Sequence, residues 1–147
     1  MLVGDGPDRR ALESRADRLG ISRRVRFVGR VDGEAKLELL AGARVVAMPS
    51  RFETFGMVAA EAMACGTPVV AFEIPSLREV VRDGAGVLVP AFDTEAFATA
   101  LAQLANDPDA VETMGSRGRD LARAYDWDDV AVRQETVYRR ALAEAGA

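Results

Sequence analysis

The sequence has 147 residues, of which 49% are hydrophobic, with a formal net charge of −4, one cysteine and no histidine. This size and apolar content suffice for one domain with a buried core, and the acidic balance argues against a nucleic-acid-binding surface. The composition excludes a histidine general base, a Ser-His-Asp triad and a histidine-ligated metal within this chain. It also excludes a disulfide framework, which is typical of a reducing compartment, so we expect a cytoplasmic location.

The first residues, MLVGDGP, have the pattern of a strand end that runs into a turn. We therefore expect the chain to begin inside a domain whose first strand is missing. Pro7 is expected at the first position of a helix that closes at Gly20, because proline suits the start of a helix and glycine its end. A strand over 25–29 and a helix capped by Asp32 follow.

Strands and helices then alternate up to about residue 92. The apolar runs are continuous rather than alternating, which is typical of a parallel sheet covered on both faces. From Asp93 onwards the pattern predicts only helices, the last of them capped by Asp128. The sequence thus predicts an α/β, doubly wound parallel sheet in residues 1–92 and a helical tail in 93–147. The expected elements between them are strands over 43–50, 67–73 and 86–90 and helices over 56–64 and 76–84.

The helix over 56–64 carries one carboxylate, Glu61, among small and apolar residues. A helix that is hydrophobic on every side is normally buried, and a buried carboxylate without a partner costs several kcal/mol. Glu61 is therefore expected either to pair with an arginine or to meet a ligand. The residue types alone leave these two alternatives open.

The start of this helix favours a ligand that contains phosphate. The positive end of the helix dipole lies near Gly56, whose lack of a Cβ lets an anion approach the backbone closely. Glu53 precedes the helix and Glu61 follows one to two turns later, so the anion site lies between two carboxylates that can accept hydrogen bonds from hydroxyls. A nucleotide diphosphate sugar has this arrangement of groups. Arg51 lies in the same loop and is either a neighbour of the phosphates or a surface arginine.

Four stretches resemble a known family. LVGDGP, RVRFVGRV, VVAMPSRFETFGMVAAEAMACGTPVVA and LREVVRDGAGVLVP are similar, in order and spacing, to the C-terminal domain of retaining GT-B glycosyltransferases of family 4, also called group 1. The similarity runs from residue 2 to about residue 138. Its most specific part is the pair Glu53 and Glu61, followed by AMACGTPVV.

The resemblance implies roles for particular residues. Glu61 would hold the ribose hydroxyls of the nucleotide, and Glu53 would be the catalytic-site residue that faces hydroxyls of the donor sugar. The backbone amides around the helix start would meet the sugar and its phosphates, and the loop after the strand over 25–29 would pass the base. The donor-binding residues implied in this way are Phe55, Gly56, Met57, Gly29, Arg30 and Val31.

The resemblance also implies the chemistry. The family transfers a sugar from a UDP- or GDP-sugar with retention, needs no metal or other cofactor, and is thought to use the donor phosphate as the base. Its members have an acceptor domain, as well as an arginine and a lysine that clamp the diphosphate, ahead of the part matched here, so this chain alone is expected to be inactive. Where the family usually has Gly-Gly, this chain has Pro75-Ser76, which puts the sugar preference in doubt.

Two other functions remain open. The chain could be a non-catalytic module that binds a nucleotide sugar or docks on a partner that supplies the other half. It could also belong to another GT-B enzyme, such as a sugar-nucleotide epimerase, which the absence of histidine disfavours. Outside the glutamates, Cys65 is expected to be a small buried residue and Trp127 a packing anchor of the last helix.

Overall fold

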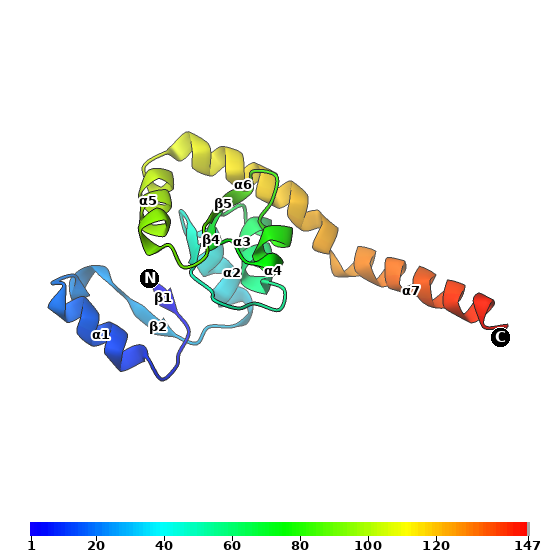
Figure 1. Ribbon diagram of the computed structural model, residues 1–147, viewed down its shortest axis with the longest axis horizontal. Helices are drawn as coiled ribbons and strands as arrows, with labels where there is room; N and C mark the ends of the chain where they lie inside the picture. Colours follow the sequence, from blue (N-terminus) through cyan, green and yellow to red (C-terminus); the bar gives the residue numbers. More distant parts are fainter. Residues whose placement is uncertain (147) are drawn as a thin grey trace. The chain divides into compact units, whose positions relative to one another are not determined.

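Parallel strands joined by helices make up the chain as far as Val89, as the apolar runs predict (Figure 1). The computed structural model describes residues 1–146. It divides the chain into two units, Met1–Glu38 and the part from Leu39 onwards. Each unit contains one parallel sheet.

The first unit is built on two short strands. β1 (Leu2–Val3) pairs in parallel with β2 (Phe27–Gly29), and α1 (Arg9–Arg18) and the 3-10 turn η1 (Ser22–Arg24) connect them. β1 is two residues long, and the chain turns after it towards α1. The expectation of a strand followed by a turn at residues 1–7 agrees with this arrangement.

The sequence predicted the C-terminal end of α1 correctly but not its N-terminal end. Asp8 is the N-cap and the helix begins at Arg9, so the expectation of Pro7 at the first helical position is wrong. The C-terminal signal is confirmed: Gly20 has a φ of 68°, and the amide of Ile21 donates to the carbonyl oxygen of Ala16 at 3.0 Å. This is the closing bond expected when glycine follows a helix.

The second unit holds a three-stranded parallel sheet in the order β3-β4-β5, which α2 (Gly33–Ala41) precedes in the chain. Its strands are β3 (Val46–Met48), β4 (Val69–Phe72) and β5 (Gly86–Val89). All four residues of β4 are buried. Because successive side chains of a strand point to opposite faces, both faces of β4 are covered, as a doubly wound sheet requires.

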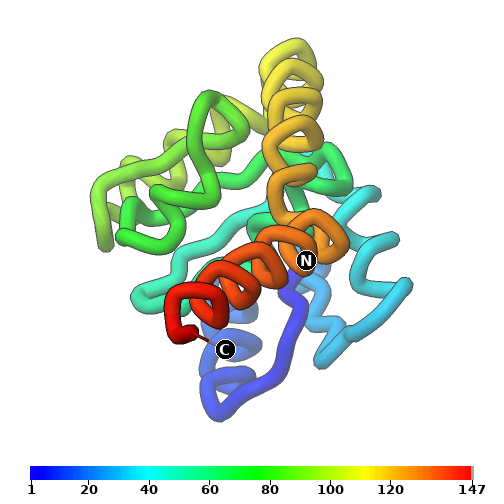
Figure 2. Tube along the Cα trace, turned by 90° about the vertical axis from the view of Figure 1, so that its right-hand side faces the viewer, coloured from blue at the N-terminus to red at the C-terminus, as the bar shows by residue number. Residues whose placement is uncertain are grey.

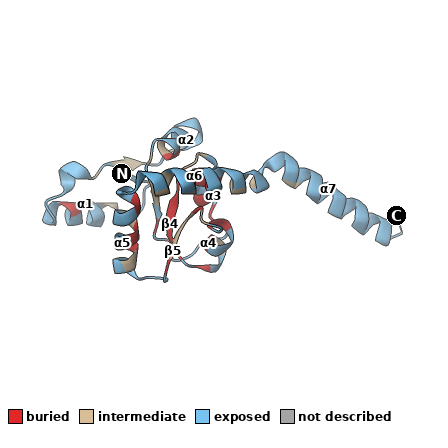
Figure 3. Ribbon diagram, turned by 90° about the horizontal axis from the view of Figure 1, so that it is seen from above, coloured by how far each residue is buried: buried red, intermediate tan, exposed pale blue. Residues whose placement is uncertain are grey.

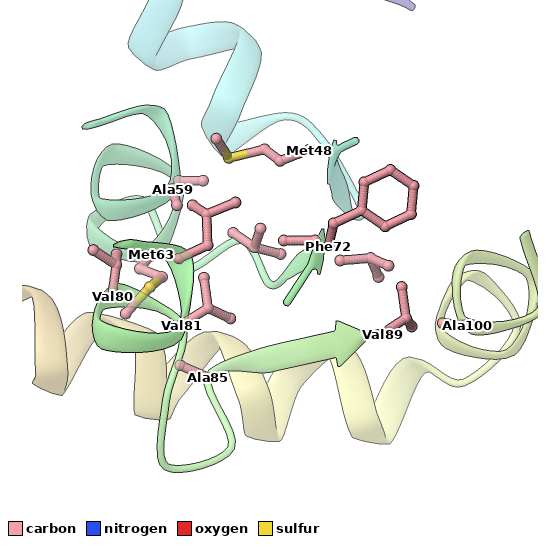
Figure 4. Close-up of a cluster of buried hydrophobic side chains, with 14 of the residues drawn as sticks. Met48, Ala59, Met63, Phe72, Val80, Val81, Ala85, Val89 and Ala100 are labelled. Carbon is pink, nitrogen blue, oxygen red and sulfur yellow. The ribbon is translucent and has the colours of Figure 1, made fainter. Parts of the chain in front are cut away.

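The core of the second unit lies between this sheet and its helices (Figure 4). Met48 and Phe72 come from the strands, Met63 and Val80 from helices, and Ala85 from the turn before β5. The other helical residues of the core come from α3 (Met57–Ala64), α4 (Pro75–Val80), α5 (Thr94–Ala105) and, through Leu40, α2. α6 (Pro108–Ala122) packs partly buried side chains against this core.

Aspartates begin the helices of the tail. Asp93 accepts hydrogen bonds from the amides of Glu95 and Ala96 at the start of α5, and Asp107 caps α6. The last helix, α7 (Trp127–Glu144), is capped by Asp126, which accepts from the amide of Asp128. The expected cap at Asp128 is therefore misplaced by two residues, because Asp128 is already inside the helix.

Two glycines bring α6 close to α3. A Cβ built on Gly115 would lie 2.2 Å from the carbonyl oxygen of Gly66, in the turn that ends α3. A Cβ built on Gly118 would lie 3.3 Å from the Cβ of Met63. Glycine at 115 therefore allows a helix-to-backbone approach that no side chain permits, whereas the fit at 118 is only tight.

α7 projects away from the three-stranded sheet (Figure 1), and the chain changes direction between α6 and α7 at the 3-10 turn η2 (Arg123–Tyr125) (Figure 2). Figure 3 shows its ribbon in the colour of exposed residues along almost its whole length. Trp127, expected to be a packing anchor, is 74% exposed, and that expectation is wrong. Among residues 1–146, no helix is both long and apolar enough to cross a membrane.

One buried polar side chain ties α2 to the end of α3. Thr67 is 3% exposed, and its hydroxyl donates to the carbonyl oxygen of Leu40 at 2.7 Å. We expect Thr67→Val to lower the free energy of unfolding by about 0.5–1.5 kcal/mol, because the hydrogen bond from Thr67 is lost while the carbonyl oxygen of Leu40 keeps the amide of Ala43 as a donor. Thr67→Ser keeps the hydroxyl and is the control. Urea denaturation measures both, and a valine variant as stable as the serine variant would contradict this role.

Candidate functional site

The loop between β3 and α3 holds Glu53 in a fixed position. The loop runs from Pro49 to Gly56 at the carboxyl end of β3, the edge at which parallel α/β sheets bind ligands. The hydroxyl of Ser50 donates to Oε1 of Glu53 at 2.9 Å, and the carboxylate is half-buried. Its second oxygen can still accept hydrogen bonds, as the expected contact with sugar hydroxyls requires.

Gly56 forms the N-cap of α3 in a left-handed conformation, with a φ of 95° and a ψ of 45°. A Cβ at this position would lie 2.7 Å from Cδ2 of the buried Leu77, so both the backbone angles and the packing require glycine. Its carbonyl oxygen accepts from the amides of Ala59 and Ala60. The amides that come before Ala59 belong to the first turn of α3. Amides in the first turn of a helix are suited to bind an anion.

Three of the expected donor-binding residues line one cavity of about 870 Å³ within the second unit. Phe55 and Met57 lie at the start of α3, and Glu61 lies one turn further along the same helix. The Oε2 atom of Glu61 is buried, although the residue as a whole is half-buried. One oxygen of the carboxylate is therefore buried, and the residue as a whole contributes to the wall of the cavity.

The opposite wall of the cavity consists of residues that the sequence analysis did not predict at this site. They lie at the end of α6, in η2 and at the start of α7: Arg119, Ala122, Arg123, Tyr125, Asp126, Trp127 and Val130. Tyr125 meets Phe55 edge to face, with ring centroids 5.3 Å apart at 86°. The nearest sequence signal was the aromatic pair Tyr125 and Trp127 at a helix start, which does not by itself point to a residue seventy positions earlier.

Cys65 ends α3 one turn after Glu61. It is half-buried, so the expectation of a buried cysteine is only partly right. Burial, and then the nearby charge of Glu61, raise the pKa of the Cys65 thiol above its usual value. Both effects disfavour the thiolate, so the neutral thiol is the dominant form at neutral pH.

The remaining expected residues belong to the first unit. Gly29 ends β2, and its carbonyl oxygen accepts from the amide of Gly4 at 2.7 Å. Arg30 is exposed and forms an ion pair with Asp32 at 3.4 Å, and Val31 is half-buried. These residues lie where the chain leaves the carboxyl end of a parallel strand.

The chain matches the family model described as glycosyl transferases group 1 over residues 1–121. It is also 42% identical over 134 residues to the D-inositol 3-phosphate glycosyltransferase of Streptomyces griseus. That match covers 90% of this chain and 28% of the relative. The chain thus spans less than a third of that enzyme's length.

Solved structures agree with this match. The sucrose-phosphate synthase of Thermosynechococcus elongatus superposes with a TM-score of 0.87 at 36% identity, over 97% of this chain and 38% of that chain. Anabaena HepE in complex with UDP-glucose superposes with a TM-score of 0.80 at 30% identity, over 95% of this chain and 40% of that chain.

Proposed function

This chain belongs to the group 1 glycosyl transferases, and we propose that it binds the nucleotide diphosphate sugar donor of a retaining enzyme. The observation that carries the proposal is the arrangement around α3. Glu61, Phe55 and Met57 line one cavity, and Glu53 lies in the loop that leads to it. The similarity to a protein solved with UDP-glucose supports a UDP-sugar as the donor, and the family resemblance allows a GDP-sugar as well.

We assign the parts of the donor as follows. The carboxylate of Glu61 accepts hydrogen bonds from the two ribose hydroxyls, and Glu53 accepts from hydroxyls of the sugar. The amides at Phe55, Gly56 and Met57 face the diphosphate at the positive end of α3. For Gly29, Arg30 and Val31, which belong to the first unit, only the resemblance implies a contact with the base.

The proposed chemistry is positional and electrostatic. The bond between the anomeric carbon and the phosphate oxygen breaks, the acceptor oxygen bonds to the same face of that carbon, and the departing phosphate takes the acceptor's proton. The protein holds the leaving diphosphate and orients the sugar, which lowers the barrier mainly by positioning. No metal or further cofactor is needed in this scheme.

The acceptor site is proposed to lie outside this chain. Relatives in the family are more than twice as long as the part matched here. Transfer requires donor and acceptor to be held together, so we expect no glycosyl transfer by the 147-residue chain alone.

Calorimetric titration tests the donor assignment directly. The purified chain is titrated with UDP-, GDP- and ADP-sugars, in buffer with EDTA and again with Mg²⁺. We expect saturable binding of a UDP- or GDP-sugar, and the same affinity in both buffers. Mg²⁺-dependent binding would contradict the metal-free scheme, and a chain that binds no sugar nucleotide at millimolar concentration would contradict the donor-binding function.

The second candidate function is a module that binds the donor but takes part in no transfer. A different measurement distinguishes it from the catalytic assignment. The chain is mixed with the remaining part of a homologous enzyme, the portion that precedes the matched region, and sugar transfer to added acceptors is assayed. Restored transfer favours the catalytic assignment. Donor binding without transfer in any such mixture favours the binding module.

A further inference from the structure

The turn after β5 has an unusual backbone. The amide of Asp93 donates to the carbonyl oxygen of Pro90 at 3.1 Å, which closes a tight turn with Phe92 as its third residue. Phe92 has a φ of 69°. This conformation normally requires glycine or asparagine, and a bulky side chain there is strained. Such strain persists where other contacts fix the residue, and it is frequent at ligand-binding sites.

The ring of Phe92 contacts two side chains, Phe72 and Arg51. Its ring meets Phe72 edge to face with centroids 5.8 Å apart, and Phe72 is itself 4% exposed and packs on Phe97. On the other side, Cζ of Arg51 lies 5.6 Å from the centre of the Phe92 ring. Phe92 remains 56% exposed. The core thus anchors a ring that supports an arginine at the surface.

The contact with Arg51 does not by itself account for the strain. A cation over an exposed aromatic ring is a weak attraction, and a bulky residue in the left-handed region costs more than such a contact returns. Phenylalanine at 92 therefore makes the turn less favourable than glycine would. A function that needs the arginine at this place explains why the chain has it.

Arg51 belongs to the loop that leads to the start of α3, although it does not line the cavity itself. It is in the loop after β3, Phe72 ends β4, and Phe92 follows β5, so the stack joins the carboxyl ends of all three strands of the sheet. Ligands of parallel α/β sheets bind at this edge. Glu53 lies two residues after Arg51 in the same loop. Within residues 1–146, Arg51 is exposed and makes neither an ion pair nor a hydrogen bond.

We propose that Arg51 binds the diphosphate of the sugar nucleotide and that Phe92 is the positioning residue that holds it there. The proposal rests on the proposed function, because it concerns the same donor. A guanidinium group can give two parallel hydrogen bonds to phosphate oxygens, and an arginine that is already held in place loses less freedom on binding. The uncommitted charge of Arg51 complements the negative diphosphate.

Titration of Arg51→Ala tests the first half of the proposal. The probes are UDP-glucose and GDP-mannose, with uridine and guanosine as matched probes that lack phosphate. We expect the affinity for the sugar nucleotide to fall about tenfold, as for the loss of one charge-assisted contact, while nucleoside affinity stays unchanged. Arg51→Lys should recover part of the loss. Arg139→Ala, an exposed arginine of α7, is the control and should bind as the parent does.

Phe92→Gly tests the second half. Glycine relieves the strain, so the melting temperature should rise, while the freed Arg51 should bind the sugar nucleotide about threefold to tenfold more weakly. Phe92→Tyr keeps the ring and should keep the affinity. A purely structural Phe92 would give the opposite pattern, a lower melting temperature with unchanged affinity, and would overturn its role.

The two levels of the proposal fail differently. If the parent chain binds neither UDP-glucose nor GDP-mannose, the donor-binding function fails and this inference with it. If the parent chain binds a sugar nucleotide and Arg51→Ala binds it within twofold of the parent, only the inference about Arg51 is overturned.

Discussion

Replacing Glu61 with alanine is expected to lower the affinity for the sugar nucleotide about 100-fold, with a change in melting temperature of no more than about 2 °C. A hydrogen bond to a charged group contributes about 1.5–3 kcal/mol, and the carboxylate is proposed to accept two of them from ribose. Each 1.4 kcal/mol is about a tenfold change in affinity. Calorimetry on the parent and the variant measures the first quantity, and thermal unfolding the second.

The control for this experiment is Glu112→Ala, which removes an exposed carboxylate from α6. It should leave both the affinity and the melting temperature unchanged. The sequence also allowed Glu61 to be one half of a structural ion pair. In that case alanine would leave a charge unpaired and lower the stability by about 3–5 kcal/mol. A large loss of stability together with unchanged nucleotide affinity would refute the ribose assignment.

Replacing Gly115 with alanine is expected to lower the free energy of unfolding by more than about 3 kcal/mol. The new Cβ would be 2.2 Å from the carbonyl oxygen of Gly66, a backbone atom held by the turn that ends α3. α6 would have to move off α3. The better helix propensity of alanine returns only about 1 kcal/mol. Since small domains have about 5–15 kcal/mol in total, much of the stability would be lost.

Gly118→Ala is the matched control, three residues along the same buried face of α6. Its Cβ would meet Met63 at 3.3 Å, so a shift of a few tenths of an ångström suffices. Better helix propensity and tighter packing then nearly cancel, and we expect stability within about 1 kcal/mol of the parent. Urea denaturation followed by circular dichroism compares the two variants. Equal stabilities for both would contradict the close approach at Gly115.

The sequence predicted the parallel sheet and its order of elements because buried strands carry a strong apolar signal. β4 is the clearest case, with four buried residues in a row between Pro68 and Glu73. The helix expected over 56–64 is confirmed as Met57–Ala64, since Gly56 and Gly66 limit it at both ends. These features depend on local chemistry that a short stretch of sequence contains.

Other features depend on contacts between distant parts of the chain. Gly118 weakens the helix pattern of 108–122 when that segment is taken alone, and only the structure shows that this position packs closely against Met63. Trp127 looked like a packing anchor because indoles are usually buried, whereas here it lines a cavity and is mostly exposed. The expected cap of α7 was wrong because two aspartates, Asp126 and Asp128, both suit a helix start.

The candidate site was predictable for one half only. The pair Glu53 and Glu61 lies within nine residues, and the resemblance attached roles to both. The wall opposite Glu61 comes from α6, η2 and α7, and its contact between Phe55 and Tyr125 joins residues that no local periodicity relates. Likewise, the stack of Arg51 on Phe92 crosses from the end of β3 to the end of β5. The assignment of ligand roles to these residues remains a prediction.

The raised pKa of the Cys65 thiol has a consequence for oxidation chemistry. Only the thiolate reacts readily with peroxides, disulfides and alkylating agents, and burial and the charge of Glu61 keep that form scarce. The one sulfhydryl of the chain lies a single helical turn from the proposed ribose contact, and the raised pKa disfavours its nucleophilic form. Modification of this cysteine would bring bulk or charge next to Glu61, so the environment that raises its pKa also favours an unmodified wall of the cavity.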